Sequence, residues 1–281
     1  MSTRVSTKKP IIAIIYDFDK TLTTTDMQNY NFIPALGMTP EEFWGETGKF
    51  SDRTGVERIL SYMYMMIVMA RDRGISLTRE FLYQQGKSMK YFDGVLTWFD
   101  RINAYGESKG IKIEHYLISS GTKEIIEGSE IAKHFKAIFG CEFYFDPKTK
   151  LPVWPKLAIN YTAKTQFYFR ITKGILDTTE DTALNRKLES HRIPHRNIIY
   201  IGDGMTDVPV MLLVKQNGGH SIAVYPKGER DKVEYLYTDG RVNFVARADY
   251  TEKSDINSIV RLIVDQVCIA EQIEKKKQLL N

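Results

Sequence analysis

The sequence contains little cysteine and no cysteine pair at metal-binding spacing. Among its 281 residues only Cys141 and Cys268 are cysteines, and there is no Cys-x-x-Cys motif. Two isolated cysteines argue against a disulfide framework and against a structural zinc site. They fit a reducing compartment, so we expect a cytoplasmic protein.

Long apolar runs and a large excess of one charge are also lacking. The 39 basic and 35 acidic residues give a net charge of +4, which is too small for the footprint of a nucleic-acid-binding protein. The longest apolar stretch, YMYMMIVMA at 62–70, has nine residues, whereas a membrane helix needs about 20. The run IIAIIY at 11–16 is shorter than the apolar region of a signal peptide. We expect a small anion as ligand and neither a nucleic-acid nor a membrane partner.

What the sequence does contain is a repeated order of strand, polar turn and helix. Apolar, β-branched-rich stretches near 11–16, 111–118 and 197–201 predict strands, and each is followed by a polar turn. The stretches 220–226 and 242–249 predict two further strands. This order is typical of an α/β fold with a doubly wound, mostly parallel, Rossmann-like sheet.

Two insertions interrupt this order. Residues 26–92 carry helical patterns, one of which begins at Thr39 and Pro40, and almost no strand pattern. So long a segment is better explained as a smaller helical domain than as a connection. Residues 143–162 predict a β-hairpin, and the tail from Lys253 predicts an amphipathic helix.

Four carboxylates lie in the polar turns that follow the predicted strands. Asp17 and Asp19 follow the first strand, and Asp203 and Asp207 follow the strand near 197–201. Ligands of open parallel sheets bind beyond the carboxyl ends of the strands, so we expect these turns to meet at one crevice. Acids without neighbouring histidine or cysteine suit a hard cation, and oxygen ligands favour Mg²⁺.

Four short motifs follow one another along the chain: Asp17-x-Asp19-x-Thr21, Ser119, Lys164 and Gly202-Asp203-Gly204-x-x-Asp207. Together they resemble the four motifs of the haloacid dehalogenase-like (HAD) superfamily. The inserted helices occupy the position at which phosphoserine phosphatase-like members carry a helical cap. The resemblance implies a core domain over 1–25 and 93–281 and a cap domain over 26–92.

The resemblance also implies roles for the acids. Asp17 is the nucleophile that forms an aspartyl-phosphate, and Asp19 is the general acid and then the general base. Mg²⁺ is held by Asp17, by the backbone carbonyl of Asp19 and by Asp203, with Asp207 beside it. A simpler alternative is that these acids only terminate turns and cap helices.

The remaining motif residues concern the phosphoryl group. By the resemblance, Ser119 and Lys164 hold its oxygens. Ser120 could replace Ser119, because either lies at the strand end, and two other lysines near Lys164 are alternatives to it, Lys156 and Lys173.

The supporting residues belong to the same turns. Gly121 completes the predicted phosphate-binding turn, Thr21 tightens the first turn, and Gly202 and Gly204 flank Asp203. All of these assignments are implied by the resemblance.

The predicted activity is that of a Mg²⁺-dependent phosphatase acting on a small phosphorylated metabolite. Because Asp19 is present, halide displacement is disfavoured, since dehalogenating members lack this carboxylate. The alternatives are a phosphotransferase or mutase with the same aspartyl-phosphate, and a non-catalytic phosphate-binding protein. The cap residues with the best claim to set specificity, although core or surface placement is their default, are Tyr30, Phe32, Trp44, Arg53 and Arg58.

Overall fold

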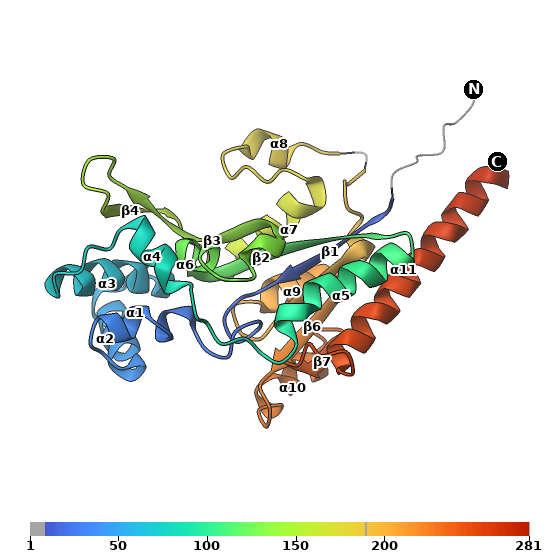
Figure 1. Cartoon of the computed structure of the whole chain (residues 1–281). Helices are drawn as coiled ribbons and strands as arrows, with labels where there is room; N and C mark the ends of the chain where they lie inside the picture. The colour runs from blue at the N-terminus through green and yellow to red at the C-terminus, as the bar shows by residue number, and fades with distance from the viewer. Residues whose placement is uncertain (1–8, 189, 281) are drawn as a thin grey trace.

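A parallel β-sheet forms the centre of the protein in the computed structural model, which describes residues 9–188 and 190–280. In this part of the chain the sheet has seven strands in the order β4-β3-β2-β1-β5-β6-β7 (Figure 1). The strands are β1 (Ile11–Tyr16), β2 (Lys112–Thr122), β3 (Phe135–Phe145), β4 (Pro152–Leu157), β5 (Ile198–Gly202), β6 (His220–Tyr225) and β7 (Phe244–Arg247). Neighbouring strands are parallel except β3 and β4. The predicted doubly wound, mostly parallel sheet is confirmed.

The first strand lies in the middle of the sheet and is buried on both faces. Its residues from Ile12 to Tyr16 have no exposed surface, as expected for a continuous apolar run in a parallel sheet. The hydroxyl of Tyr16 accepts a hydrogen bond from Trp98 Nε1 (2.8 Å) and pairs with Nδ1 of His115 (3.0 Å). The strand that precedes Asp17 is therefore fixed by packing and by hydrogen bonds.

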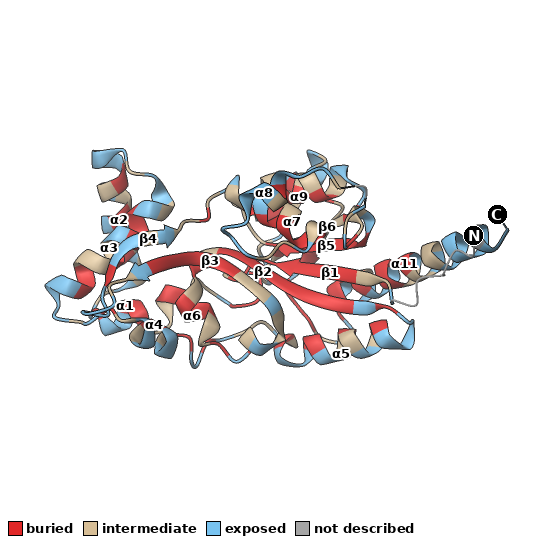
Figure 2. Ribbon diagram, turned by 90° about the horizontal axis from the view of Figure 1, so that it is seen from above, coloured by how far each residue is buried: buried red, intermediate tan, exposed pale blue. Residues whose placement is uncertain are grey.

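Helices cover both faces of the sheet (Figure 2). The helices of the sheet region are α5 (Val95–Ser108), α6 (Lys123–Glu127), α7 (Ala163–Lys173), α8 (Asp181–Asn185), α9 (Val208–Gln216), α10 (Asp231–Thr238) and α11 (Asp255–Leu280). α5 and α6 pack on β2 from one face, and α11 packs on α5. α7 and α9 lie on the other face and pack on each other. This is the layered arrangement expected of a doubly wound sheet.

The segment between β1 and β2 is helical. After the 3₁₀ turn η1 (Met27–Asn29) it forms α1 (Phe32–Ala35), α2 (Pro40–Thr54), α3 (Arg58–Asp72) and α4 (Arg79–Gln85). α2 begins at Thr39 and Pro40, as the sequence predicts, and Thr39 also forms a capping box with Glu42. These helices lie beside the β3 and β4 end of the sheet (Figure 1).

The backbone of α4 makes a close contact with the loop that follows α6. A Cβ atom added to Gly86 would lie 2.0 Å from the carbonyl oxygen of Ile125. One added to Gly128 would lie 1.8 Å from the carbonyl oxygen of Tyr83. Only glycine permits this approach, so the end of α4 packs directly on the sheet region.

Two predicted boundaries differ from the structure. The hairpin expected at 143–162 is formed by β3 and β4, but β3 begins earlier, at Phe135, and its first half pairs with β2. The expected turn at Ser119–Thr122 lies within the irregular last residues of β2, where the register shifts against β3. Pairing between β2 and β3 accounts for both differences. It makes the first half of β3 a strand, and it keeps the end of β2 extended beyond its apolar run.

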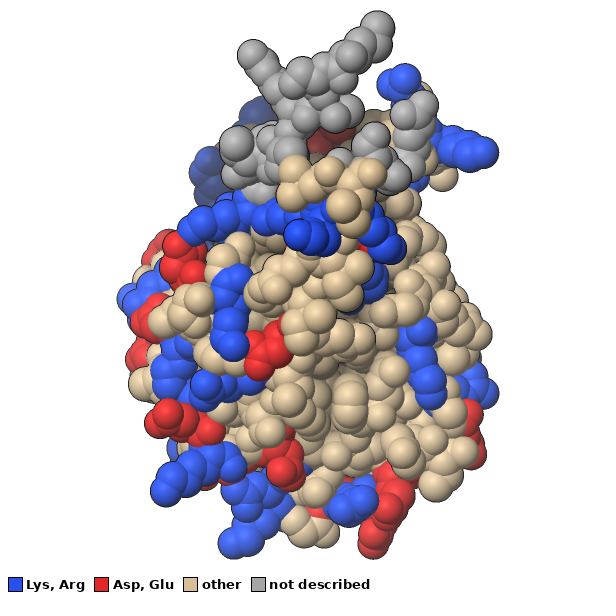
Figure 3. Space-filling model, turned by 90° about the vertical axis from the view of Figure 1, so that its right-hand side faces the viewer, with Lys and Arg blue, Asp and Glu red and all other residues tan. Residues whose placement is uncertain are grey.

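None of the described helices is both long and apolar enough to pass through a bilayer. The face drawn in Figure 3 has Lys and Arg gathered towards the top, next to the grey atoms, and Lys and Arg interspersed with Asp and Glu on the left and at the bottom. The mixture matches the small net charge of +4.

The contact between α4 and α6 gives a prediction for stability. We expect Gly86→Ala to lower the free energy of unfolding by about 1–3 kcal/mol, because the added methyl group meets backbone atoms that cannot rotate away. Gly45→Ala is the matched control: this exposed glycine of α2 has no atom within 4 Å of the added Cβ. The control should raise stability by about 0.5–1 kcal/mol. Urea unfolding of both variants tests this, and equal stabilities would contradict the close packing.

Candidate active site

The carboxyl ends of three neighbouring strands meet at one cavity. β2, β1 and β5 are adjacent in the sheet, and the chain leaves them at Gly121–Thr122, Asp17 and Asp203 respectively. The cavity has a volume of about 350 Å³. From the sheet region it is lined by Asp17, Asp19, Lys20, Ser119, Ser120, Gly121, Asp203, Gly204, Met205 and Thr206, and from the inserted segment by Asp26, Gln28, Trp44, Thr47, Gly48, Arg58, Ile59 and Tyr62.

The turn after β1 is held by backbone hydrogen bonds. The Asp17 amide donates to the carbonyl of Ile201 in β5 (2.9 Å), and the Leu22 amide donates to the carbonyl of Phe18 (2.9 Å). The buried hydroxyl of Tyr250, which follows β7, donates to the carbonyl of Thr21 (2.8 Å). The neighbouring strand β5 and the segment after β7 therefore hold the turn that carries Asp17.

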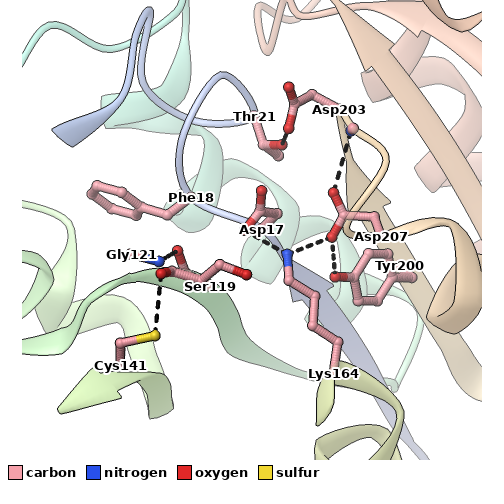
Figure 4. Close-up of polar contacts among 12 residues, drawn as sticks. Asp17, Phe18, Thr21, Ser119, Gly121, Cys141, Lys164, Tyr200, Asp203 and Asp207 are labelled. Carbon is pink, nitrogen blue, oxygen red and sulfur yellow. Dashed lines mark hydrogen bonds and ion pairs between the residues drawn. The ribbon is translucent and has the colours of Figure 1, made fainter. Parts of the chain in front are cut away.

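Lys164 lies in the first turn of α7 and is fully buried. Its Nζ donates to Oδ1 of Asp17 (3.0 Å) and to Oδ1 of Asp207 (2.6 Å) (Figure 4). Burial alone would lower the pKa of Lys164, but the two carboxylates outweigh it and raise the pKa above its ordinary value. The lysine is therefore charged and bridges two of the predicted site acids.

Asp207 is oriented by further donors. The hydroxyl of Tyr200 on β5 donates to its Oδ1 (2.6 Å), and the Gly204 amide donates to its Oδ2 (3.3 Å). A Cβ atom on Gly202 would lie 2.7 Å from the Asp207 carboxyl carbon, so this position has room only for glycine. Both oxygens of Asp207 thus accept hydrogen bonds from protein donors, Lys164 among them.

Three carboxylates come close together in this site. Oxygen atoms of Asp17, Asp203 and Asp207 lie within 4.8 Å of one another, and Thr21 Oγ1 donates to Oδ1 of Asp203 (3.4 Å). Burial, and then the Asp207 charge, raise the pKa of Asp17 to about 6, although Lys164 opposes the shift. Burial, followed by the charges of Asp17 and Asp207, raises the pKa of Asp203 well above its ordinary value. The cluster carries more negative charge than one lysine offsets.

Asp19 points to a different part of the cavity. Its Oδ1 accepts a hydrogen bond from the Met27 amide (2.7 Å), which places it at the entry to the inserted helices. Burial, with the charges of Asp26 and Asp17, raises the pKa of Asp19 well above its ordinary value. Asp26 itself is paired with Lys20 (2.8 Å). A carboxyl in such surroundings retains its proton to higher pH than an exposed one.

The end of β2 supplies hydroxyl and amide groups. The Oγ of Ser119 accepts a hydrogen bond from the Gly121 amide (2.9 Å), and Ser119 is buried. The Oγ of Ser120 is also buried and has no hydrogen-bond partner among the described residues. A Cβ atom on Gly121 would lie 3.0 Å from Oδ2 of Asp19. The turn is therefore pressed against the general acid that the resemblance implies.

The sequence is similar to that of a curated protein over nearly the whole length of both chains. No family model matches the sequence. An uncharacterised protein of Borreliella burgdorferi is 27% identical over 289 aligned residues, which cover 94% of this chain and 99% of that protein.

Solved structures give a closer view of the architecture. A HAD family hydrolase from Salmonella enterica serovar Typhi aligns with a TM-score of 0.58 at 17% identity, covering 90% of this chain and 72% of that one. A substrate-bound phosphoserine phosphatase aligns with a TM-score of 0.56 at 15% identity, covering 91% and 99%. The chain has the HAD-like fold of phosphoserine phosphatases. A phosphoserine phosphohydrolase-like protein from Francisella tularensis is similar as well, with a TM-score of 0.52 at 19% identity over 84% and 94%.

The HAD-like motif residues lie together in this structure. Seven of them line the cavity: Asp17, Asp19, Ser119, Ser120, Gly121, Asp203 and Gly204. Lys164 and Asp207 lie directly beneath, where Lys164 donates hydrogen bonds to Asp17 and to Asp207. Thr21 supports Asp203, and Gly202 makes room for Asp207. The chemical roles assigned to these residues stay predictions.

The inserted helices bring only some of the predicted specificity residues to the cavity. Trp44 and Arg58 line the cavity. Tyr30 instead bonds to the backbone of Thr25 and Lys90, where the chain enters and leaves the insertion. Phe32 is buried against Phe43, and Arg53 is exposed.

Sequence reasoning missed several lining residues of the insertion, among them Gln28, Thr47 and Tyr62. Tyr62 lies inside a nine-residue apolar stretch that predicts core packing alone. Tyr200 beneath the site was also missed, because a tyrosine in a buried strand carries no motif. Its bond to Asp207 needs coordinates to be seen.

The raised pKa of Asp17 predicts how stability depends on pH when a chelator removes divalent cations. In the unfolded chain the Asp17 carboxyl loses its proton at about pH 3.9, whereas in the folded protein its pKa is about 6. Between these values the folded state binds more protons, so the free energy of unfolding should fall as pH rises and then level off. Asp17→Asn should lack this contribution, as urea unfolding over a pH series would show.

The control for this measurement is Asp239→Asn, at an exposed carboxylate that ends α10. Its pH profile should follow that of the wild type. Identical profiles for wild type and Asp17→Asn would contradict the buried, repelled state of Asp17.

Proposed function

We propose that this protein is a Mg²⁺-dependent phosphatase that hydrolyses a small phosphate monoester through an aspartyl-phosphate. The observation that carries the proposal is the buried Lys164 bridge between Asp17 and Asp207 at the end of three parallel strands. It fixes one carboxylate at the floor of a cavity, beside hydroxyl and amide groups suited to phosphoryl oxygens. The HAD-like fold, shared with phosphoserine phosphatases, supports the same reaction class.

The acid cluster fits a divalent cation by charge and by donor type. Asp17, Asp203 and Asp207 carry three negative charges when ionised, and Lys164 supplies one positive charge, which leaves a net charge of −2 in a buried place. Carboxylate oxygens with no histidine or cysteine in the cluster suit Mg²⁺. Asp17, Asp203 and the backbone carbonyl of Asp19 would hold the ion. When bound, it would neutralise this charge and bind a phosphoryl oxygen.

Asp17 is the nucleophile in the proposed reaction. One of its carboxylate oxygens attacks phosphorus in line, so that an oxygen–phosphorus bond to Asp17 forms while the bond to the leaving oxygen breaks. Asp19 gives its proton to that oxygen, and the product leaves as an alcohol. The raised pKa of Asp19 supports this role, because a buried carboxyl can still be protonated when the substrate binds.

Hydrolysis of the aspartyl-phosphate restores the site. Asp19, now a carboxylate, takes a proton from a water molecule as that water attacks phosphorus. The bond between phosphorus and the Asp17 oxygen breaks, and inorganic phosphate is released. Throughout, Lys164 and the Ser119 hydroxyl donate to phosphoryl oxygens and offset the charge that develops on them.

The substrate is proposed to be a small phosphorylated metabolite. The cavity of about 350 Å³ lies at the small end of ligand pockets, which span about 300–1,000 Å³. Trp44, Ile59 and Tyr62 form an apolar wall above the acids, with Arg58 beside them. We propose that residues 26–92 act as a cap that selects the leaving group, and that the protein works in the cytoplasm without a nucleic-acid or membrane partner.

Substitution of Asp17 tests its proposed role as the nucleophile. Asp17→Asn should lower phosphate release by at least about 10³-fold with the fold retained, because the amide cannot attack phosphorus. The measurement is phosphate release from a panel of phosphorylated metabolites and an aryl phosphate, with Mg²⁺ and with chelator. Asp239→Asn serves as control and should keep the wild-type rate.

The panel also separates the competing functions. Wild-type rates in Asp17→Asn would overturn the mechanism. Transfer of the phosphoryl group to an added alcohol or sugar in preference to water would identify a phosphotransferase or mutase. No release from any substrate by the wild type would favour a phosphate-binding protein.

A second prediction concerns the metal. Asp203→Asn should raise the Mg²⁺ concentration for half-maximal activity by about 10-fold or more, because it removes one of the charged oxygen ligands. Activity titrated against Mg²⁺ gives this midpoint, and Asp239→Asn should leave it unchanged. An unshifted midpoint in Asp203→Asn would mean that other groups hold the ion.

A further inference from the structure

One peptide unit of the candidate phosphate site receives hydrogen bonds from two other elements. The carbonyl oxygen of Ser120 accepts from the Tyr62 hydroxyl (2.7 Å) and from the Cys141 thiol (3.2 Å). Cys141 lies on β3, the strand next to β2, and the dashed line at its sulfur in Figure 4 marks this hydrogen bond. Tyr62 lies on α3, in the inserted helices. The end of β2 is thus tied to the insertion by a direct bond.

The other end of the same peptide unit is bound as well. Its N–H, which belongs to Gly121, donates to the Oγ of Ser119 (2.9 Å). The C=O and N–H of a trans peptide point in opposite directions within one plane. The direction of the Ser120 carbonyl therefore determines where the Gly121 N–H points, and a hydrogen bond at one end orients the other.

This geometry controls the Ser119 hydroxyl. Because its oxygen accepts from the Gly121 N–H, its own hydrogen is available to donate elsewhere. Ser119 lines the cavity beside Asp17, so the free donor is suited to a phosphoryl oxygen. Rotation of the peptide would withdraw the N–H and release the hydroxyl from this orientation.

The surroundings of Tyr62 explain why its hydroxyl can act in this way. Tyr62 is 5% exposed, and its ring packs edge-on against Trp44 with centroids 6.1 Å apart. One turn further along α3, the Met66 sulfur accepts a hydrogen bond from Thr122 Oγ1 (3.7 Å). Two successive turns of α3 therefore contact the end of β2, which fixes the direction of the Tyr62 hydroxyl.

We propose that Tyr62 is a positioning residue of the phosphate site. Its hydroxyl fixes the Ser120–Gly121 peptide, the peptide fixes the Ser119 hydroxyl, and the Ser119 hydroxyl binds phosphate. The site is thus complete only when α3 is seated on β2. This inference rests on the proposed function, because it takes the cavity to bind a phosphoryl group.

The test uses inorganic phosphate as the probe, since it has no leaving group for the Tyr62 ring to contact. In Tyr62→Phe we expect the inhibition constant of phosphate against aryl phosphate hydrolysis to rise about 3- to 10-fold, the usual effect of one lost hydrogen bond. Tyr64→Phe is the matched control, because Tyr64 lies on the same helix but is 50% exposed and stacks on Phe50. The control should leave the inhibition constant unchanged.

A double-variant cycle shows whether Tyr62 acts through Ser119. Ser119→Ala should weaken phosphate inhibition on its own. Adding Tyr62→Phe to Ser119→Ala should then produce no further loss, because the group that Tyr62 orients is gone. A loss equal to that of the single Tyr62→Phe variant would overturn the proposed route.

A second variant controls for a folding defect in Tyr62→Phe. Cys141→Ala removes the other donor to the same carbonyl and leaves α3 intact. It should raise the phosphate inhibition constant in the same direction but by less, because a thiol is a weak donor. Melting temperatures of all variants, measured with the activities, separate loss of phosphate binding from loss of fold.

The outcomes distinguish this inference from the proposed function. Wild-type protein that hydrolyses aryl phosphate and is inhibited by phosphate, together with an unchanged inhibition constant in Tyr62→Phe, would overturn the role of Tyr62 alone. Wild-type protein that neither hydrolyses aryl phosphate nor responds to phosphate would overturn both.

Discussion

The ion pair of Lys164 with Asp17 and Asp207 is the constraint on which the rest of the site depends. A buried ammonium without partners is costly, and so are two buried carboxylates. Together they are tolerable, with distances of 3.0 Å and 2.6 Å. The three residues lie directly after β1, in α7 and directly before α9, so the ion pair forms only when the sheet and the helices on one face are assembled. The site therefore forms only as the sheet and these helices fold together.

The residues around this ion pair orient its two carboxylates. Tyr200 and the Gly204 amide hold Asp207, and Tyr250 holds the turn behind Asp17. Each of these groups donates to an oxygen that would otherwise be free to move. Reacting groups held in one geometry need little reorganisation when charge develops. The inserted helices add a second layer, because Tyr62 reaches the end of β2 from above the cavity.

Much of the fold and of the candidate site was predictable from the sequence. β1 is an uninterrupted apolar run, and only a strand covered on both faces explains it. Asp17, Asp203 and Ser119 could be placed together because parallel strands end at one edge. Tyr62 and Tyr200 could not be found, because their function depends on a hydroxyl direction that periodicity does not encode. The first half of β3 was missed because its strand character comes from pairing with β2 and not from its own pattern.

The hairpin at the end of the sheet has a consequence for the behaviour of the protein at high concentration. β4 is the outermost strand on its side, and within its six residues it contains Pro152 and Pro155. Proline has no N–H to offer an incoming strand, so this border is a poor template for pairing with a second molecule. An apolar parallel sheet such as this one would otherwise be prone to edge-to-edge aggregation. The two prolines on β4 thus limit the hydrogen bonds that a second chain could form along this edge.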